Sequence, residues 1–303
     1  MKQVYWSAAT TKAGGGSFVE NIEASHVEMP DGRRLGYQQY GDPSGKPILW
    51  FHGWIGSRLD FAPNDAVAKE LGLKVIAPDR PGCGSSDFQP NRSVNDWPDD
   101  VTALADGLGI GRFGVIGHSF GGPFVAACAH SIPERVSECV IVAGIASIRV
   151  KGITKGMKGP GRFALQVGAI APPLTKPFVS GMASMTRRPE TLKKGLASML
   201  PEDEAAILDS PGFAGFADNM GEMVKNGNAG AYADAKAFLG DWRFDPADIE
   251  IPVQLFYGSA DSNVPLPMGE WYRDTVPDAE LTVYEGEGHF IMYTRAREIL
   301  SAM

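Results

Sequence analysis

The sequence feature that most restricts the fold is an alternation of short apolar runs with helix-like segments. Continuous apolar runs of this kind occupy residues 47–51, 74–77, 112–117, 136–145, 251–257 and 280–285. A short run without polar alternation is typical of a strand that is covered on both faces. Helix-like segments separate successive runs in the first half of the chain, and this order indicates parallel strands joined by crossover helices. The sequence therefore predicts an α/β protein with a mostly parallel, doubly wound sheet.

Two regions depart from this alternation. Residues 25–42 alternate apolar and polar side chains on either side of a turn at Pro30-Asp31-Gly32, which predicts an antiparallel hairpin. Between about Ile145 and Asp248 the strand pattern is lost, and several helix-like stretches replace it. We therefore expect a lead-in at 1–24, a core formed by 25–145 and 248–303, and a helical cap at 146–247.

Composition serves to exclude classes of protein. The chain of 303 residues has a formal net charge of −8, which argues against a nucleic-acid-binding surface because such a surface needs clustered positive charge. The N-terminus has no apolar signal segment, and no apolar run reaches about 18 residues, so we expect a cytoplasmic protein without a transmembrane helix. Cys83, Cys128 and Cys139 do not have the spacing of a disulfide framework or a metal motif.

Polar side chains follow the apolar runs at the points where the predicted strands end. Ser119, Asp261 and His289 each come shortly after a different run. In an open parallel sheet, the loops at the carboxyl ends of the strands converge on one crevice. We therefore expect these three side chains to lie close together, although they are far apart in the chain.

The stretch around Ser119 allows two interpretations. The serine lies between a predicted buried strand and a predicted helix, where a hydroxyl group commonly caps the helix N-terminus. The same stretch, Gly117-His118-Ser119-Phe120-Gly121, also fits the G-x-S-x-G pattern of a nucleophile on a sharp strand-to-helix turn. Gly117 and Gly121 would supply the small residues that such a turn needs. An aspartate and a histidine at other strand ends favour the nucleophile over the cap.

These features resemble the α/β-hydrolase superfamily from about residue 25 to the end of the chain. The resemblance rests on the Gly117–Gly121 pentapeptide, the chain order Ser119, Asp261, His289, the pair His52-Gly53 and the glycine-rich loop at 79–86. It implies an α/β-hydrolase fold, with a mostly parallel sheet, an N-terminal antiparallel hairpin and an inserted helical cap. We expect no role as general base for the remaining histidines, which are His26, His52, His118 and His130.

The resemblance also assigns roles to residues. Ser119 is expected to be the nucleophile, His289 the general base and Asp261 the acid that orients the histidine. The backbone N–H groups of Trp54 and Phe120 are expected to form the oxyanion hole. Asp79 and Arg80 are expected to tie their loop together.

A serine nucleophile predicts catalysis through an acyl-enzyme, with attack on an ester, thioester, lactone or activated amide. It argues against the epoxide hydrolases and haloalkane dehalogenases of the superfamily, which use an aspartate at this position. The sequence has no metal, nucleotide or flavin motif, and the mechanism needs no cofactor. We therefore expect a serine hydrolase, most simply a carboxylesterase whose partner is a small to medium apolar substrate molecule.

The predicted cap carries apolar side chains that we expect to line the substrate pocket. They are Met157, Phe163, Met182, Met185, Phe213 and Phe216. Three alternatives stay open. A prolyl aminopeptidase-like enzyme could use acidic residues at 201–209 to hold a substrate ammonium group, and carbon–carbon bond hydrolases and perhydrolases use the same triad. The third alternative is a ligand-binding α/β-hydrolase fold without turnover. The sequence does not predict the oligomeric state.

Overall fold

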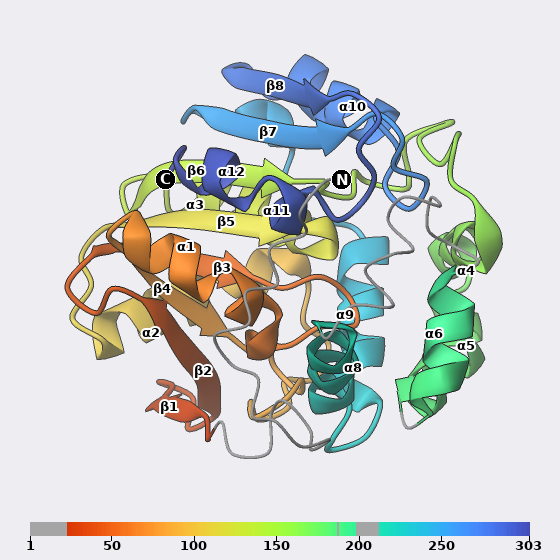
Figure 1. Ribbon diagram of the computed structural model, residues 1–303, viewed down its shortest axis with the longest axis horizontal. Helices are drawn as coiled ribbons and strands as arrows, with labels where there is room; N and C mark the ends of the chain where they lie inside the picture. Colours follow the sequence, from red (N-terminus) through yellow and green to blue (C-terminus); the bar gives the residue numbers. More distant parts are fainter. Residues whose placement is uncertain (1–22, 187, 198–211) are drawn as a thin grey trace.

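The computed structural model describes residues 23–186, 188–197 and 212–303, and its centre is an eight-stranded sheet (Figure 1). The strand order is β1-β2-β4-β3-β5-β6-β7-β8. The strands are β1 (Ser25–Glu28), β2 (Arg34–Gly41), β3 (Lys46–Phe51), β4 (Leu73–Pro78), β5 (Phe113–His118), β6 (Val136–Val142), β7 (Val253–Gly258) and β8 (Ala279–Tyr284). Neighbouring strands from β4 to β8 run parallel, whereas β2 is antiparallel to both β1 and β4. This confirms the predicted parallel sheet and its N-terminal antiparallel hairpin.

Helices cover both faces of the sheet. One face carries α2 (Trp97–Gly107), α3 (Gly122–Ser131) and α10 (Pro267–Thr275), and the other carries α1 (Asp65–Glu70), α11 (Ile291–Thr294) and α12 (Ala296–Leu300). Within β3, Leu49 and Phe51 pack toward the first group of helices, while Ile48 and Trp50 pack toward the second. Since both faces of a central strand are buried, its side chains are apolar without alternation.

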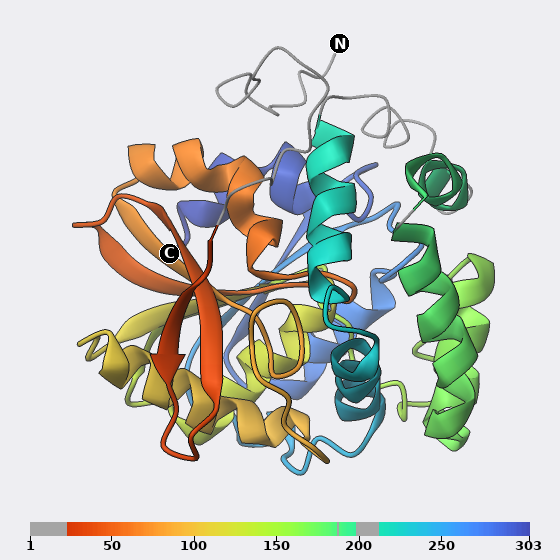
Figure 2. The ribbon, with the colours of Figure 1, turned by 90° about the horizontal axis from the view of Figure 1, so that it is seen from below.

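Five α-helices of the described residues lie between β6 and β7 in the chain and beyond the carboxyl ends of the parallel strands in space (Figure 1). They are α4 (Gly159–Ile170), α5 (Lys176–Thr186), α6 (Pro189–Ala197), α8 (Gly212–Met223) and α9 (Ala229–Leu239). Figure 2 shows α4, α5 and α6 in green, well away from the β1–β2 hairpin. We call residues 146–247 the cap segment; its division from the core at these positions stays a prediction. Across the described ranges, every helix is too short or too polar to span a bilayer.

Candidate active site

The turn at Ser119 joins β5 to helical backbone within a few residues. β5 ends one residue before Ser119, and α3 begins three residues after it. Ser119 has a φ of +57°, a left-handed conformation that strains any residue with a side chain. A Cβ atom on Gly121 would lie 2.2 Å from the carbonyl oxygen of Phe51, and a Cβ atom on Gly117 would lie 2.7 Å from that of Gly121. Only glycine fits at these two positions, and close packing of the turn therefore holds the serine at its tip.

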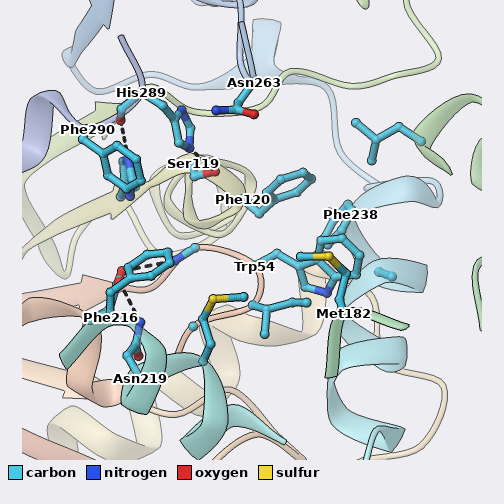
Figure 3. Close-up of a pocket in the computed structure, with 18 of the residues that line it drawn as sticks. Trp54, Ser119, Phe120, Met182, Phe216, Asn219, Phe238, Asn263, His289 and Phe290 are labelled. Atoms are coloured by element: carbon cyan, nitrogen blue, oxygen red, sulfur yellow. Dashed lines mark hydrogen bonds between the residues drawn. The ribbon is translucent and has the colours of Figure 1, made fainter. Parts of the chain in front are cut away.

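A continuous chain of hydrogen bonds links the serine, the histidine and the aspartate that follow β5, β8 and β7. His289 Nε2 lies 3.0 Å from Ser119 Oγ (Figure 3), and His289 Nδ1 lies 2.7 Å from Asp261 Oδ2. Because an ionised carboxylate only accepts hydrogen bonds, we assign the ring proton to Nδ1. Nε2 is then the acceptor for the serine hydroxyl. The other carboxylate oxygen of Asp261 accepts the backbone N–H groups of Asn263 at 2.7 Å and Val264 at 2.9 Å.

The loops that carry Asp261 and His289 are packed directly on each other. The backbone N–H of Ala260 donates to the carbonyl oxygen of Glu287 at 2.9 Å. A Cβ atom on Gly258, the last residue of β7, would lie 2.3 Å from that same oxygen. A glycine at the end of β7 therefore allows the two loops to approach, and this approach places the carboxylate against the imidazole.

His118, the neighbour of the serine, makes a different contact. Its Nε2 donates to the backbone carbonyl oxygen of His289 at 3.0 Å, and the two rings lie 4.8 Å apart. Burial, together with the nearby His289, lowers the pKa of His118 to about 3, so its ring stays neutral. His118 supports the backbone of the residue that contacts Ser119. His26 and His130 bond to Ser85 and Ser131 instead.

The loop after β3 lies against the serine. A Cβ atom on Gly53 would lie 3.4 Å from Ser119 Cβ and 3.9 Å from Ser119 Oγ. Trp54 and Phe120 line the same cavity as Ser119, with their ring centroids 5.7 Å apart. The Trp54 indole donates to the carbonyl oxygen of Ala231 in α9 at 2.9 Å. The N–H of Phe120 belongs to the first helical turn, where N–H groups have no acceptor within the helix.

The peptide group between Gly53 and Trp54 is held from its carbonyl side. The Gly53 oxygen accepts hydrogen bonds from His52 Nδ1 at 2.8 Å and from Arg80 Nη2 at 3.1 Å. Arg80 Nη1 also donates to the carbonyl oxygen of His52 at 2.6 Å. We assign the His52 proton to Nδ1 because its Nε2 accepts the backbone N–H of Arg80 at 3.3 Å. Since this peptide is trans, its N–H points away from Arg80.

Arg80 is held in turn by Asp234 of α9, and both side chains are fully buried. Arg80 Nη2 lies 2.7 Å from Asp234 Oδ2, and Arg92 bonds to the other oxygen. Burial alone would raise the pKa of Asp234, but the charges of Arg80 and Arg92 hold this pKa well below its ordinary value. Burial and the charge of Arg80 lower the pKa of His52 to about 3. The expected loop-tying role of Arg80 therefore extends to the cap segment.

Above Ser119 lies a cavity of about 170 Å³. Its wall includes the apolar or aromatic side chains of Trp54, Ile55, Phe120, Met157, Leu165, Phe178, Met182, Phe216, Met220, Ala235, Phe238, Leu239 and Phe290. Polar lining side chains outside the Ser119–His289 pair are Asp60, His118, Thr175, Asn219, Asn263 and Tyr293. The cavity is thus mostly apolar, with a small number of polar groups.

The structure corrects part of the predicted pocket lining. Met157, Met182 and Phe216 do line the cavity, but Phe163 is 71% exposed and is not part of its lining. Met185 packs instead against an apolar cluster that includes residues of α5, α6 and α8. An apolar residue on a helix indicates burial only when that face of the helix has a partner, and the sequence does not show which face does. Phe213 and the acidic stretch at 201–209 lie outside the side chains that the structure describes.

Among the pocket and loop residues that the sequence did not single out are Asp60, Asn219 and Asp234. Asp60 and Asn219 line the cavity, and Asp234 braces the loop after β3 through Arg80. Asp60 follows the His52-Gly53 pair closely in the chain, so the sequence could have indicated that it lies near the cavity. Asn219 and Asp234 lie in cap-segment helices with no motif around them, and only packing reveals their roles. Within the described residues, no three His, Cys, Asp or Glu side chains are grouped as a metal site requires.

Known proteins match nearly the whole chain. A non-heme chloroperoxidase of Streptomyces lividans is 28% identical over 289 residues, covering 88% of this chain and 94% of that protein. A 2-hydroxy-6-oxononadienedioate/2-hydroxy-6-oxononatrienedioate hydrolase of Burkholderia vietnamiensis is 29% identical, covering 80% and 78%. A bifunctional esterase/perhydrolase of Acinetobacter calcoaceticus is 26% identical, covering 90% and 96%.

The fold and the sequence agree on the family. The crystal structure of a hydrolase from Pseudomonas aeruginosa PA01 superposes with a TM-score of 0.68 at 19% identity, covering 93% of this chain and 97% of that one. At that identity the likeness shows the fold alone. Residues 46–296 match the family model for the alpha/beta hydrolase fold. The chain belongs to the α/β-hydrolase family.

Proposed function

We propose that this protein is a serine hydrolase that cleaves carboxylic esters of small to medium apolar substrates. The observation that carries the proposal is the hydrogen-bonded chain from Asp261 through His289 to Ser119, at the base of a mostly apolar cavity. A serine hydroxyl is a weak nucleophile by itself, and an adjacent neutral imidazole removes its proton as it attacks. Asp261 orients that imidazole and stabilises it once it is protonated.

The reaction proceeds in two stages. Ser119 Oγ bonds to the ester carbonyl carbon while its proton passes to His289 Nε2. The tetrahedral intermediate collapses, the bond to the alcohol oxygen breaks, and His289 returns the proton to the departing alcohol. A water molecule then gives a proton to His289 and attacks the acyl carbon, the bond to Ser119 Oγ breaks, and the acid leaves as the serine regains its proton.

The backbone N–H groups of Trp54 and Phe120 stabilise the developing oxyanion. The Phe120 N–H belongs to the first turn of the helix, where the helix dipole adds to its effect. The Trp54 N–H is oriented because Arg80 and His52 hold the opposite end of its peptide group. Each such donor contributes about 10²–10³ in rate in other oxyanion holes.

A second candidate reaction uses the same acyl-enzyme. Two relatives are named chloroperoxidase and esterase/perhydrolase. If hydrogen peroxide replaces water in the second stage, its oxygen attacks the acyl carbon and the product is a peracid. The two reactions share the first stage, so they differ only in the nucleophile that enters afterwards.

Hydrolysis of p-nitrophenyl esters of increasing acyl length, with and without hydrogen peroxide, tests both candidates. We expect turnover by the wild type, and we expect Ser119→Ala to lower kcat by about 10⁶. Ser301→Ala, which removes an exposed serine, is the matched control and should retain full activity. A fluorophosphonate probe should label the wild type and the control but not Ser119→Ala. Activity or labelling that survives Ser119→Ala would refute the nucleophile, and an unlabelled wild type would favour a binding protein without turnover.

A further inference from the structure

The cavity has two chemically different ends. Figure 3 shows Met182 and Phe238 on one side of the cavity, and Asn219 beside Phe216 on another. Near Asn219, the lining residues include the carboxylate of Asp60, which is the one acidic side chain among the described lining residues. These lining residues include no lysine or arginine. A lone carboxylate on an apolar wall needs an explanation, because burying a charge costs free energy unless hydrogen bonds compensate.

The two carboxylate oxygens of Asp60 differ in the hydrogen bonds that they accept. Oδ1 accepts hydrogen bonds from Asn219 Nδ2 at 3.0 Å and from the Tyr293 hydroxyl at 3.1 Å. In the part of the chain that the structure describes, the contact of Oδ2 is with the backbone N–H of Gly53 at 3.5 Å, longer than an ordinary hydrogen bond. Asp60 is only 7% exposed, so bulk water cannot fully replace the missing donor. Burial raises the pKa of Asp60, which is consistent with an acceptor that is incompletely satisfied.

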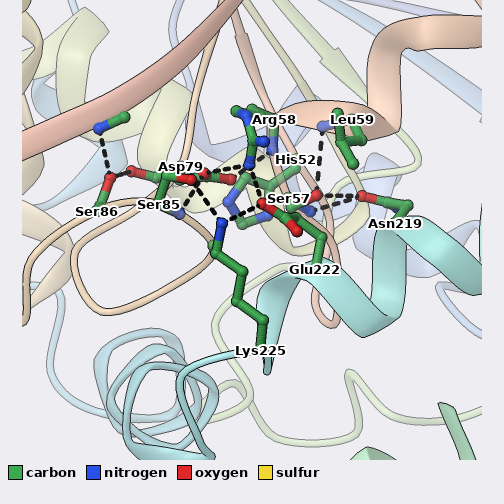
Figure 4. Close-up of polar contacts among 12 residues, drawn as sticks. His52, Ser57, Arg58, Leu59, Asp79, Ser85, Ser86, Asn219, Glu222 and Lys225 are labelled. Carbon is green, nitrogen blue, oxygen red and sulfur yellow. Dashed lines mark hydrogen bonds and ion pairs between the residues drawn. The ribbon is translucent and has the colours of Figure 1, made fainter. Parts of the chain in front are cut away.

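The carboxylate is also unable to turn toward other donors, because its neighbours are fixed. Asn219 Oδ1 accepts both the backbone N–H and the hydroxyl of Ser57, each at 2.8 Å (Figure 4). This leaves the amide N–H₂ of Asn219 directed at Asp60 Oδ1. Asn219 of α8 and Tyr293 of α11 therefore hold Oδ1 from two separate elements. Among the described residues, Oδ2 has only the long contact with Gly53, which also lines the cavity.

We propose that Asp60 Oδ2 is a substrate-binding subsite for a hydrogen-bond donor, a hydroxyl or an ammonium group, carried by the part of the substrate that lies near Asn219. The inference rests on the proposed ester hydrolysis and names the chemistry of one end of its substrate. The other end of the substrate is apolar and packs near Met182 and Phe238. A carboxylate at the Asp60 end is excluded by repulsion, because the lining offers no cation to pair with it.

Matched p-nitrophenyl esters test this subsite. They are the hexanoate, its hydroxylated forms at carbons 3 to 6, and the 6-aminohexanoate. We expect the wild type to prefer at least one donor-bearing ester over the hexanoate by about tenfold in kcat/KM, the contribution of one hydrogen bond to a buried charged group. Preference for the hydroxylated or for the amino ester identifies the donor.

Asp60→Asn is the diagnostic substitution. Its amide oxygen can still accept from Asn219 and Tyr293, while its N–H₂ group replaces Oδ2 and turns the acceptor into a donor. We expect the ratio of donor-bearing ester to hexanoate to fall to about one or lower. Asp100→Asn changes another buried carboxylate, paired with Arg33 away from the cavity, and should keep the wild-type ratio. A wild-type ratio near one, or a ratio that survives Asp60→Asn, would overturn the subsite.

A binding measurement separates failure of the subsite from failure of the proposed function. Hexan-1-ol, hexane-1,6-diol and 6-aminohexan-1-ol are titrated calorimetrically into Ser119→Ala, which needs no turnover. We expect the diol or the amino alcohol to bind about tenfold more tightly than hexan-1-ol, and the difference to vanish in Ser119→Ala/Asp60→Asn. Equal binding of all three would refute the subsite even if no ester is hydrolysed. A difference in affinity between hexan-1-ol and the donor-bearing alcohols that vanishes with Asp60→Asn would support the subsite, even if no ester is hydrolysed.

Discussion

Asp261 and Asp234 are both buried carboxylates, but they have different partners. Asp261 faces the neutral imidazole of His289, and backbone N–H groups bind its other oxygen. Asp234 lies between the guanidinium groups of Arg80 and Arg92. Both are buried, yet only the first has as its partner an imidazole, a ring that can accept and release a proton. A guanidinium group stays charged at all ordinary pH values.

This difference separates a site that can move a proton from one that holds structure. In the proposed reaction, the Asp261 carboxylate gains a favourable partner when His289 becomes protonated, so its charge would assist that step. At Asp234 the carboxylate is already paired with two guanidinium groups, and Arg80 connects it to the carbonyl oxygen of Gly53. Substitutions at the two positions should therefore affect different measured quantities, and the following predictions run from the largest effect to the smallest.

Asp261→Asn should lower kcat by about 10⁴ with little change in KM, because an amide does not stabilise the protonated imidazole or hold its tautomer. Steady-state kinetics on the best p-nitrophenyl ester measures this. Urea denaturation should show that the free energy of unfolding changes much less, in proportion, than kcat does. If the variant instead unfolds readily while its folded fraction turns over at the wild-type rate, Asp261 would be a structural group like Asp234.

Asp234→Asn should destabilise the fold by about 3–5 kcal/mol, because two buried guanidinium groups lose their counterion. The free energy of unfolding from urea titration measures this. Asp106→Asn is the control: this exposed carboxylate pairs with Arg135 at the surface, and its loss should cost less than about 1 kcal/mol. Equal effects at the two positions would mean that the Asp234 cluster does not brace the fold.

Arg80→Lys tests whether the ion pair between Arg80 and Asp234 positions the proposed oxyanion donor, the N–H of Trp54. Lysine keeps a positive charge for Asp234 but lacks the fork that also donates to the carbonyl oxygens of His52 and Gly53. We expect kcat to fall about 10- to 100-fold with KM nearly unchanged, since a misplaced oxyanion donor weakens transition-state binding. Arg33→Lys, at an ion pair away from the cavity, should leave kcat unchanged. A rise in KM without a fall in kcat would contradict this role.

The smallest expected effect is at His52, whose substitution should change how the free energy of unfolding depends on pH. Its pKa is lowered to about 3 in the folded protein, against about 6.5 when unfolded. Below pH 6.5 only the unfolded state takes up this proton, so the His52 contribution to stability falls as the pH falls toward 3. His52→Asn, which retains a donor in the place of Nδ1, should reduce the slope of stability against pH by about 1.4 kcal/mol per pH unit between pH 4 and 6. Parallel wild-type and variant curves would show that His52 titrates normally in the folded state.

Short stretches of the sequence were enough to predict the fold and the residues that lie around Ser119. The strands were visible because a parallel strand that is buried on both faces has apolar side chains throughout. The turn at Ser119 was visible because its glycines are required by contacts with the adjoining backbone, as the position of Gly121 against Phe51 illustrates. Asp261 and His289 could be placed because the carboxyl ends of parallel strands meet at one edge of the sheet.

Only the tertiary structure placed the cap-segment residues. Asn219 contacts Ser57 and Asp60, and Asp234 contacts Arg80, across more than 150 positions of the chain. The orientation of a helix about its own axis depends on what packs against it, so Phe163 faces solvent while Phe216 lines the cavity. The sequence by itself determined the sheet, the turn at Ser119 and the chain order of Ser119, Asp261 and His289, since short-range backbone geometry and strand topology require them. The polar end of the cavity and the bracing of the loop after β3 by Arg80 and Asp234 were decided by long-range packing, because each needs side chains from separate elements to meet.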